Sequence, residues 1–156
     1  MRRLFADLLF NEMVGNKDIV VVTADLGYKM WDPIRAAYPN QFYNVGSAEQ
    51  LMVGAGVGLA LSGKIPILYS ITPFLLYRPF ELIRNYVNHE KIPVKLVGSG
   101  RDKDYTHDGF SHWAEEDVHD VFPNINQKYP DSLEELRDIF QKVIYNGLPC
   151  YLNLRR

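Results

Sequence analysis

Short apolar segments rich in β-branched residues alternate with longer segments of helical periodicity along this chain, and this alternation most constrains its fold. The apolar segment that follows Asp18 has no polar alternation, which is typical of a strand buried on both faces. We predict that this strand ends near Ala24 and that others follow at residues 42–45, 66–71, 93–98, 124–129 and 149–154. Helices are predicted at residues 2–14, 32–38, 47–61, 79–90, 114–122 and 132–147, with a polar loop at 99–112. The alternation indicates an α/β fold, a three-layer sandwich whose mostly parallel central sheet has helices on both faces.

The length and charge of the chain limit the classes of protein to which it can belong. With 156 residues it is large enough for its own core, and we expect one domain over residues 1–156. Hydrophobic residues make up 47% of the chain and charged residues 23%, as in ordinary globular proteins. The formal net charge of -2 gives no electrostatic reason to expect binding to nucleic acid or to an anionic membrane.

Three sequence features predict a cytoplasmic location. Gly, Pro or charged residues interrupt the apolar stretches, which are therefore too short to span a membrane. Residues 1–13 predict an amphipathic helix and not a signal peptide, because they lack a long apolar run and a small-residue cleavage site. Cys150 is the single cysteine, so no internal disulfide can form.

Residues 42–64 contain one carboxylate, Glu49, at the start of a predicted helix that is otherwise apolar. A buried carboxylate is costly unless it is paired or protonated. Two interpretations follow: Glu49 faces water and interacts favourably with the helix dipole, or it has a chemical task. We expect Ser47 to cap this helix. Gly54, Gly56 and Gly58 lie inside the helix and not in a strand-to-helix turn, so they predict close packing on the sheet and not a dinucleotide site.

Five motifs in order resemble the pyrimidine-binding domain of the transketolase family. They are NVGSAEQLMVGAGVGLALSGKIP, FELIRN, PVKLVGS, DGFSHWAEEDV and GLPCYLNLR, and the resemblance extends from Ile19 to Arg155. The same domain occurs in deoxyxylulose-phosphate synthases and in the beta subunits of pyruvate dehydrogenase-type enzymes. The resemblance implies the fold of this domain and thiamine diphosphate as the cofactor.

The resemblance implies a task for Glu49 and positions for the cofactor around it. In this family the glutamate of the Ala-Glu-Gln motif bonds to N1′ of the aminopyrimidine and so activates the cofactor, and a buried carboxyl can share a proton with a ring nitrogen. Phe74 matches the second of two aromatic residues placed against the pyrimidine ring, and Ile71 stands at the first of these positions. Tyr77 is expected to complete the aromatic wall. Asp25 matches an acid near the thiazole ring and the substrate, although an aspartate next to Gly27 also suits a simple turn.

The polar loop at 99–112 supplies the candidate substrate residues. Asp108 and His112 match family residues that line the substrate channel, and we expect His112 to be catalytic because histidine exchanges protons near neutral pH. His107, also a substrate candidate, replaces the usual glutamate, and Gly100 stands where transketolases often have a histidine, which suggests an unusual substrate. No helical ligand spacing supports a metal site in this loop. Arg155 matches a position at which many transketolases bind the substrate phosphate, although it can equally be a solvated terminal arginine.

The sequence lacks the Gly-Asp-Gly motif through which the family binds Mg²⁺ and the cofactor's diphosphate. The resemblance therefore implies a split enzyme, in which a second subunit holds Mg²⁺ and the diphosphate in an α2β2 heterotetramer. Aromatic residues make up 13% of the chain, and we expect some of them to form the surface that meets this partner. The isolated chain is expected neither to bind thiamine diphosphate tightly nor to turn over substrate.

The resemblance leaves three functions open. The first is a transketolase-like transferase of carbohydrate metabolism that moves a two-carbon ketol unit from a sugar or sugar phosphate to an acceptor sugar. The second is a synthase or dehydrogenase that decarboxylates a 2-oxo acid, and the third is a regulatory remnant without catalytic activity.

Overall fold

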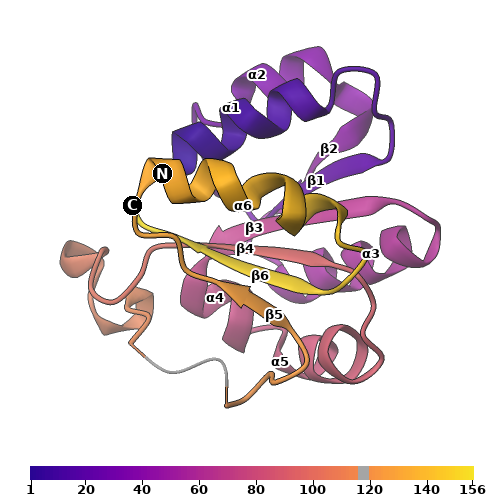
Figure 1. The fold of residues 1–156 in the computed structure, drawn as a ribbon. Helices are drawn as coiled ribbons and strands as arrows, with labels where there is room; N and C mark the ends of the chain where they lie inside the picture. The colour runs from indigo at the N-terminus through magenta and orange to yellow at the C-terminus, as the bar shows by residue number, and fades with distance from the viewer. Residues whose placement is uncertain (116–119) are drawn as a thin grey trace.

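The computed structural model describes residues 1–115 and 120–156 (Figure 1). The strands are β1 (Ile19–Thr23), β2 (Phe42–Asn44), β3 (Ile65–Ile71), β4 (Lys95–Ser99), β5 (Asn126–Lys128) and β6 (Cys150–Leu154). The α-helices are α1 (Arg2–Glu12), α2 (Asp32–Ala37), α3 (Glu49–Leu61), α4 (Thr72–Tyr77), α5 (Phe80–Leu82) and α6 (Leu133–Tyr145). Shorter helical segments are the 3-10 helices η1 (Pro39–Gln41), η3 (Thr106–Asp108) and η4 (Phe110–His112), and the π-helix η2 (Ile83–His89).

Within the described part of the chain the six strands form one sheet in the order β2-β1-β3-β4-β6-β5, and every pairing is parallel. In the register of the four longest strands, Val21 lies beside Ile67, Ile67 beside Lys95, and Lys95 beside Cys150. Because the strands are parallel, their carboxyl ends meet at one edge, where ligands of α/β proteins commonly bind. The predicted α/β fold is confirmed.

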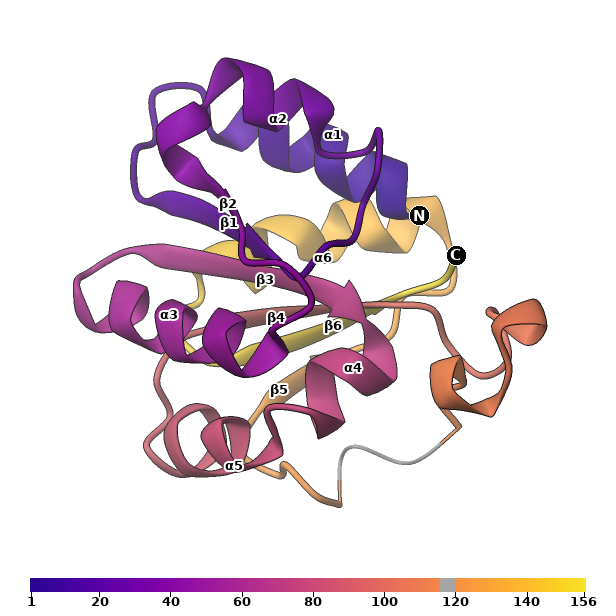
Figure 2. The same ribbon diagram turned by 180° about the vertical axis from the view of Figure 1, so that it is seen from behind.

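Helices cover both faces of the sheet, and alternate strand residues face each layer. Helices α1, α2 and α6 cover one face, and α3, α4 and α5 with η2 cover the other (Figures 1 and 2). On β1, for example, Val21 packs in the core beneath α1 and α6, whereas Val20 and Val22 pack in the core beneath α3 and α4. Burial of both faces explains why the strand sequences are uniformly apolar.

The glycines of α3 have different packing roles. A Cβ atom on Gly56 would lie 2.7 Å from Cδ1 of Leu68, so only glycine lets α3 approach β3 this closely. The prediction of close packing is confirmed at Gly56. At Gly58 a Cβ atom would meet nothing within 4 Å, and at Gly54 it would lie 3.9 Å from the nearest side-chain atom, on Leu82, so for these two glycines the prediction is wrong.

Several local predictions are wrong. Ser47 does not cap α3, because the N-cap residue is Ala48 and no side chain caps this end. Helix α4 was not predicted, although Pro73 suits the first turn of a helix. Within the polar loop, η3 and η4 are short 3-10 helices.

Residues 116–119 of the predicted helix 114–122 lie outside the described residues. Its first residue, Ala114, pairs instead with Asp102 in an antiparallel bridge, and residues 120 and 121 form a turn. The helix predicted at 79–90 is present as α5 followed by η2. In the described residues no helix combines the length and apolarity needed to cross a membrane.

Candidate active site

Glu49 is the first residue of α3, at the carboxyl edge of the sheet, and its side chain is buried. Only 2% of the side chain is exposed, so the interpretation that Glu49 faces water is wrong. Nη1 of Arg78 donates to both carboxylate oxygens at 2.9 Å, and the hydroxyl of Ser70 donates to Oε1 at 3.4 Å. The cost of burying the Glu49 carboxylate is thus offset by the ion pair with Arg78 and by the hydrogen bond from Ser70, which lies near the end of β3.

Phe74 and Arg78 lie four residues apart on and just after α4, and therefore on the same side of this helix. The guanidinium carbon of Arg78 lies 3.7 Å from the centroid of the Phe74 ring, in a cation-π contact. The same guanidinium thus contacts an aromatic face and the Glu49 carboxylate. Sequence reasoning missed both Arg78 and Ser70. The four-residue spacing from Phe74 is a signal for Arg78, but only once residues 72–77 are known to be helical.

His112, at the end of η4, approaches the aromatic ring of Phe74. The two ring centroids are 4.8 Å apart at an interplanar angle of 66°. The ring of Tyr105 lies 6.1 Å from the His112 ring, and Nδ1 of His112 is 3.0 Å from the hydroxyl of Ser111. The structure therefore brings Glu49, Phe74 and His112 together at one edge of the sheet, from three segments far apart in the sequence.

A buried polar network fixes the start of α4 relative to the sheet. Nδ2 of Asn153 donates to the Thr72 hydroxyl at 2.9 Å, to the Tyr151 hydroxyl at 2.8 Å and to the carbonyl of Gly100 at 3.0 Å. The Thr72 hydroxyl also donates to the Gly100 carbonyl at 2.6 Å. A Cβ atom on Gly98 would lie 2.6 Å from the Thr72 hydroxyl, so this network also depends on a small residue in β4. The ring of Phe74 is thus positioned by hydrogen bonds from β6 and from the turn after β4.

The other predicted cofactor residues lie around this centre. Ile71 ends β3 and precedes α4, and it is 8% exposed. Tyr77 ends α4 and is 42% exposed. Asp25 has a positive φ of 53° and its backbone amide donates to Oδ1 of Asn44 at 2.9 Å, which fits the turn that we considered as the alternative role.

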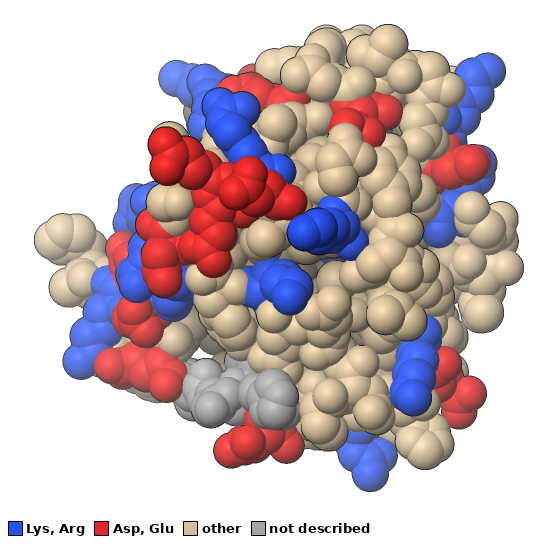
Figure 3. Space-filling model, viewed as in Figure 1, with Lys and Arg blue, Asp and Glu red and all other residues tan. Residues whose placement is uncertain are grey.

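Arg155 lies among carboxylates, and this environment was not predicted. Its guanidinium is 3.4 Å from Asp102, 4.0 Å from Asp104 and 3.6 Å from Asp131. Figure 3 shows acidic and basic side chains gathered on the side of the molecule where the C-terminus lies. An anionic group that binds Arg155 would have to compete with these carboxylates.

Two substrate candidates, His107 and Asp108, lie in η3. Oδ2 of Asp108 is 3.9 Å from Arg156, and His107 is exposed. The described residues contain no group of three or more His, Cys, Asp or Glu side chains that could hold a metal ion.

A cation-rich cleft opens next to Tyr105. It has a volume of about 540 Å³, and its lining includes Arg2, Arg3, Lys29 and Arg156. Nη1 of Arg2 donates to the Tyr105 hydroxyl at 3.3 Å, which ties the start of α1 to the cleft. Sequence reasoning missed this cleft, because its residues come from both ends of the chain and from the turn after β1.

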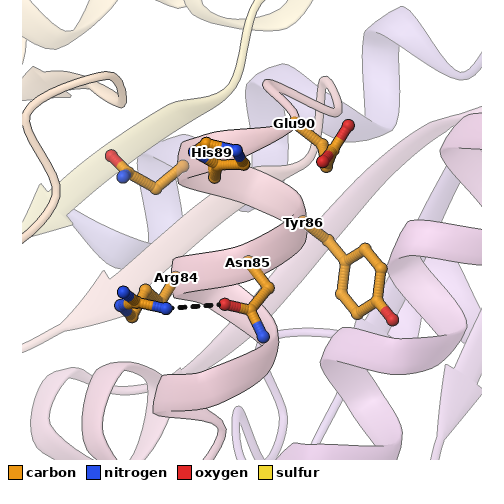
Figure 4. Close-up of a pocket in the computed structure, with 6 residues that line it drawn as sticks. Arg84, Asn85, Tyr86, His89 and Glu90 are labelled. Atoms are coloured by element: carbon orange, nitrogen blue, oxygen red, sulfur yellow. Dashed lines mark hydrogen bonds between the residues drawn. The ribbon is translucent and has the colours of Figure 1, made fainter.

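A second hollow lies along η2, and Figure 4 shows its lining side chains. They all belong to one helix and the residue that follows it, and Arg84 and Tyr86 project from it in opposite directions. The only bond drawn between them joins Arg84 to Asn85 at 3.0 Å. Side chains that diverge in this way do not converge on a ligand, and the site around Glu49 is the stronger candidate.

A parallel sheet with a buried carboxylate and an aromatic ring at its carboxyl edge defines the class of α/β domains that bind a ligand at this edge. The whole chain, residues 1–156, matches the model of the transketolase pyrimidine binding domain, and the protein belongs to this family. Membership in the family implies dependence on thiamine diphosphate.

Three relatives illustrate this membership. An apulose-4-phosphate transketolase subunit of Actinobacillus succinogenes is 33% identical over 99% of this chain and 50% of its own length. The 6-deoxy-6-sulfo-D-fructose transketolase subunit SqwH of a Clostridium species is 30% identical over 100% of this chain and 49% of its own. A solved structure described as a split gene transketolase, inactive beta4 tetramer, has a TM-score of 0.82 at 31% identity and covers 99% of this chain and 50% of that one. The chain thus spans about half the length of these relatives.

The residues at the site fit the aminopyrimidine half of thiamine diphosphate. Glu49 offers buried acceptor oxygens, and Phe74 offers an aromatic face beside them. The guanidinium of Arg78, a flat group that bears N–H donors, already contacts both. A flat nitrogen heterocycle can be held by the same two groups.

Proposed function

We propose that this chain is the pyrimidine-binding part of a thiamine-diphosphate-dependent, transketolase-like transferase. The buried carboxylate of Glu49 beside the Phe74 ring is the observation that carries this proposal. Exposure to water would have suited a helix-capping acid, whereas burial suits a residue that holds a proton at a ring nitrogen. The names of two relatives, each of which specifies a transketolase subunit, support the same interpretation.

In this proposal thiamine diphosphate supplies the nucleophilic carbon and the electron sink for two-carbon transfer. Glu49 holds and moves a proton at N1′ of the aminopyrimidine, and Phe74 orients the ring by stacking, with Ile71 and Tyr77 at the margins of the pocket. His112, next to Phe74, exchanges a proton with the substrate. Asp25, Asp108 and His107 remain predicted contacts of the cofactor or of the sugar.

We also propose that Mg²⁺ and the diphosphate are held by a second subunit, in an α2β2 assembly. Large aromatic side chains that are exposed in this chain support a surface for such a subunit. Tyr28, which lies in the turn after β1 and lines the cleft next to Tyr105, is 88% exposed, and Phe110, at the start of η4, is 85% exposed. Large exposed aromatic groups are enriched where proteins meet.

The substrate class that we propose is a sugar with an anionic tail. The cleft next to Tyr105 gathers Arg2, Arg3, Lys29 and Arg156, and a guanidinium is well suited to bind an oxyanion. The names of two relatives specify sugars that carry a phosphate or a sulfo group. Arg155 joins this set if an anionic tail displaces its carboxylate partners.

The test of the function is the activity of the chain combined with its partner subunit. With a ketose phosphate donor and an aldose acceptor, Glu49→Gln should lower kcat by about 100-fold or more, because proton transfer typically contributes that much. Glu81→Gln removes an exposed carboxylate on α5 and serves as the control, which should retain activity. Full activity of Glu49→Gln would refute the catalytic role and favour the regulatory remnant, and release of carbon dioxide from pyruvate would favour the 2-oxo acid decarboxylase.

The substrate class has its own test. Arg3→Met should raise KM for a phosphorylated donor several-fold while kcat changes little, because the cleft contributes binding energy away from the reacting atoms. Lys17→Met removes an exposed charge outside the cleft and should leave both constants unchanged. Equal KM values in wild type and Arg3→Met would contradict an anionic subsite at this cleft.

A further inference from the structure

Arg78 occupies the space between the Phe74 ring and the Glu49 carboxylate. Its guanidinium carbon is 3.7 Å from the ring centroid, and Nη1 is 2.9 Å from each oxygen of Glu49. A ring that stacks on this face of Phe74 and bonds to Glu49 must use the same space. The guanidinium is a flat group with N–H donors, and an aminopyrimidine whose N1′ carries the proton shared with Glu49 is also flat and presents an N–H there, so each can satisfy the two partners in a similar way.

We propose that Arg78 holds the pyrimidine site in the free chain and is displaced when the cofactor's aminopyrimidine binds. This inference rests on the proposed function of Glu49 and Phe74. Arg78 thereby keeps the buried carboxylate paired until the heterocycle takes over as its partner. Without such a placeholder, the buried Glu49 carboxylate would keep its hydrogen bond from Ser70 but lose the cation that balances its charge, and folded proteins avoid unbalanced buried charges.

The position of Arg78 allows it to leave the site. Its side chain is 46% exposed, whereas that of Glu49 is 2% exposed, so the guanidinium can be hydrated as soon as it turns away. Arg78 is also the C-cap residue that follows α4, just before Pro79, and it lies outside the buried network around Asn153. A rotation of its side chain therefore requires no change in the elements that position Phe74.

The consequence is a competition that lowers the apparent affinity for the cofactor. If Arg78 occupies the site in most free chains, the observed dissociation constant equals the intrinsic constant divided by the small fraction of chains in which Arg78 has left the site. Arg78 thus determines how readily the pyrimidine site binds the cofactor's aminopyrimidine, without acting on the substrate.

Titration of the full chain with thiamine tests this inference, because thiamine carries the aminopyrimidine but no diphosphate. Binding is measured by calorimetry, or by ligand-observed NMR if it is weak, and no turnover is needed. Arg78→Met removes the charge and the hydrogen bonds and should tighten thiamine binding about tenfold, as expected for removal of a competitor that is mostly bound. Arg84→Met is the matched control, because Arg84 is exposed and bonds to Asn85 and not to Glu49, and its binding should equal that of wild type.

A second variant separates displacement from simple charge repulsion. Arg78→Lys keeps the charge but loses the planar stack on Phe74, so displacement predicts affinity between those of wild type and Arg78→Met. Wild-type affinity in Arg78→Lys with tighter binding in Arg78→Met would assign the effect to net charge and overturn the inference. Weaker binding in Arg78→Met would also overturn it, because Arg78 would then be a contact of the bound ring.

Glu49→Gln distinguishes failure of this inference from failure of the proposed function. If thiamine binds wild type and Arg78→Met equally and Glu49→Gln weakens that binding, the pyrimidine site stands and only the displacement of Arg78 is refuted. If thiamine binds none of these variants, or binds them all regardless of Glu49, both the inference and the proposed pocket are refuted.

Discussion

The ring of Tyr105 lies directly against Gly100, where a Cβ atom would be only 2.4 Å from Cε2 of the tyrosine. Gly100 has a φ of +89°, a conformation that favours glycine. This is the position at which transketolases often have a histidine, and here the ring of Tyr105 fills the adjacent space. Tyr105 lines the cation-rich cleft and also lies near His112. With glycine at position 100, the ring of Tyr105 therefore forms part of the wall of the candidate substrate site.

Gly100→Ala should lower the free energy of unfolding by about 2 to 4 kcal/mol, because it combines a steric overlap with an unfavourable positive φ. In a Tyr105→Ala background the overlap is gone, and only the backbone cost of about 1 kcal/mol should remain. Urea unfolding of wild type, the two single variants and the double variant measures both values. Equal losses in the two backgrounds would show that the tyrosine ring is not the obstacle.

Gly56 and Gly58 lie on the same helix and should respond to alanine in opposite directions. Gly56→Ala drives a methyl group into Leu68 and should cost about 1 to 3 kcal/mol of stability. Gly58→Ala meets no atom within 4 Å and should gain up to about 1 kcal/mol from helix propensity. Thermal and urea unfolding provide the comparison, and a stable Gly56→Ala variant would contradict the close approach of α3 to β3.

Because two tyrosines are buried, we expect the free energy of unfolding to fall at alkaline pH. Burial raises the pKa of Tyr69 and of Tyr151 above the ordinary value near 10. The folded chain therefore keeps phenolic protons that the unfolded chain releases at the same pH. The stability that the two neutral tyrosines contribute is fully present below about pH 10 and is lost as the pH rises above it. Each residue should lower the free energy of unfolding by up to about 1.4 kcal/mol per pH unit in that range.

Urea unfolding between pH 8 and pH 12 (roughly the span in which a tyrosine titrates) measures this slope. Tyr151→Phe removes one of the two groups and should make the slope shallower than in wild type. An identical slope in Tyr151→Phe would show that ionisation of this residue does not limit stability at alkaline pH.

The Glu49–Arg78 pair should show measurable coupling in a double-mutant cycle. Glu49→Gln and Arg78→Met, singly and together, should give an interaction of about 1 kcal/mol, since the half-exposed guanidinium is screened by water. The exposed pair Asp32–Arg35, at 3.3 Å, is the matched control and should give about 0.3 kcal/mol, from Asp32→Asn and Arg35→Met. Coupling no larger at Glu49 than at Asp32 would argue against a specific contact with Arg78.

The sequence alone was sufficient for the architecture, because that information is local. Uninterrupted β-branched runs such as Ile19–Thr23 specify buried strands, and the motif around Glu49 pointed to the family. Ser132 precedes α6, and its hydroxyl accepts from the amide of Glu135 at 3.0 Å, as expected of a serine at the start of a helix. Ser47 is not the cap because α3 begins at Glu49, which places Ala48 at the N-cap position.

Only the tertiary structure decided which side chains meet at the site. Arg78 pairs with Glu49, 29 residues away, because the parallel sheet brings the start of α3 next to the end of α4. Arg155 lies among carboxylates because the turn after β4 and the segment before α6 converge beside β6. Helix and strand preferences act over a few residues, whereas ion pairs and ring contacts depend on how whole elements pack, and this packing is set by burial across the sheet.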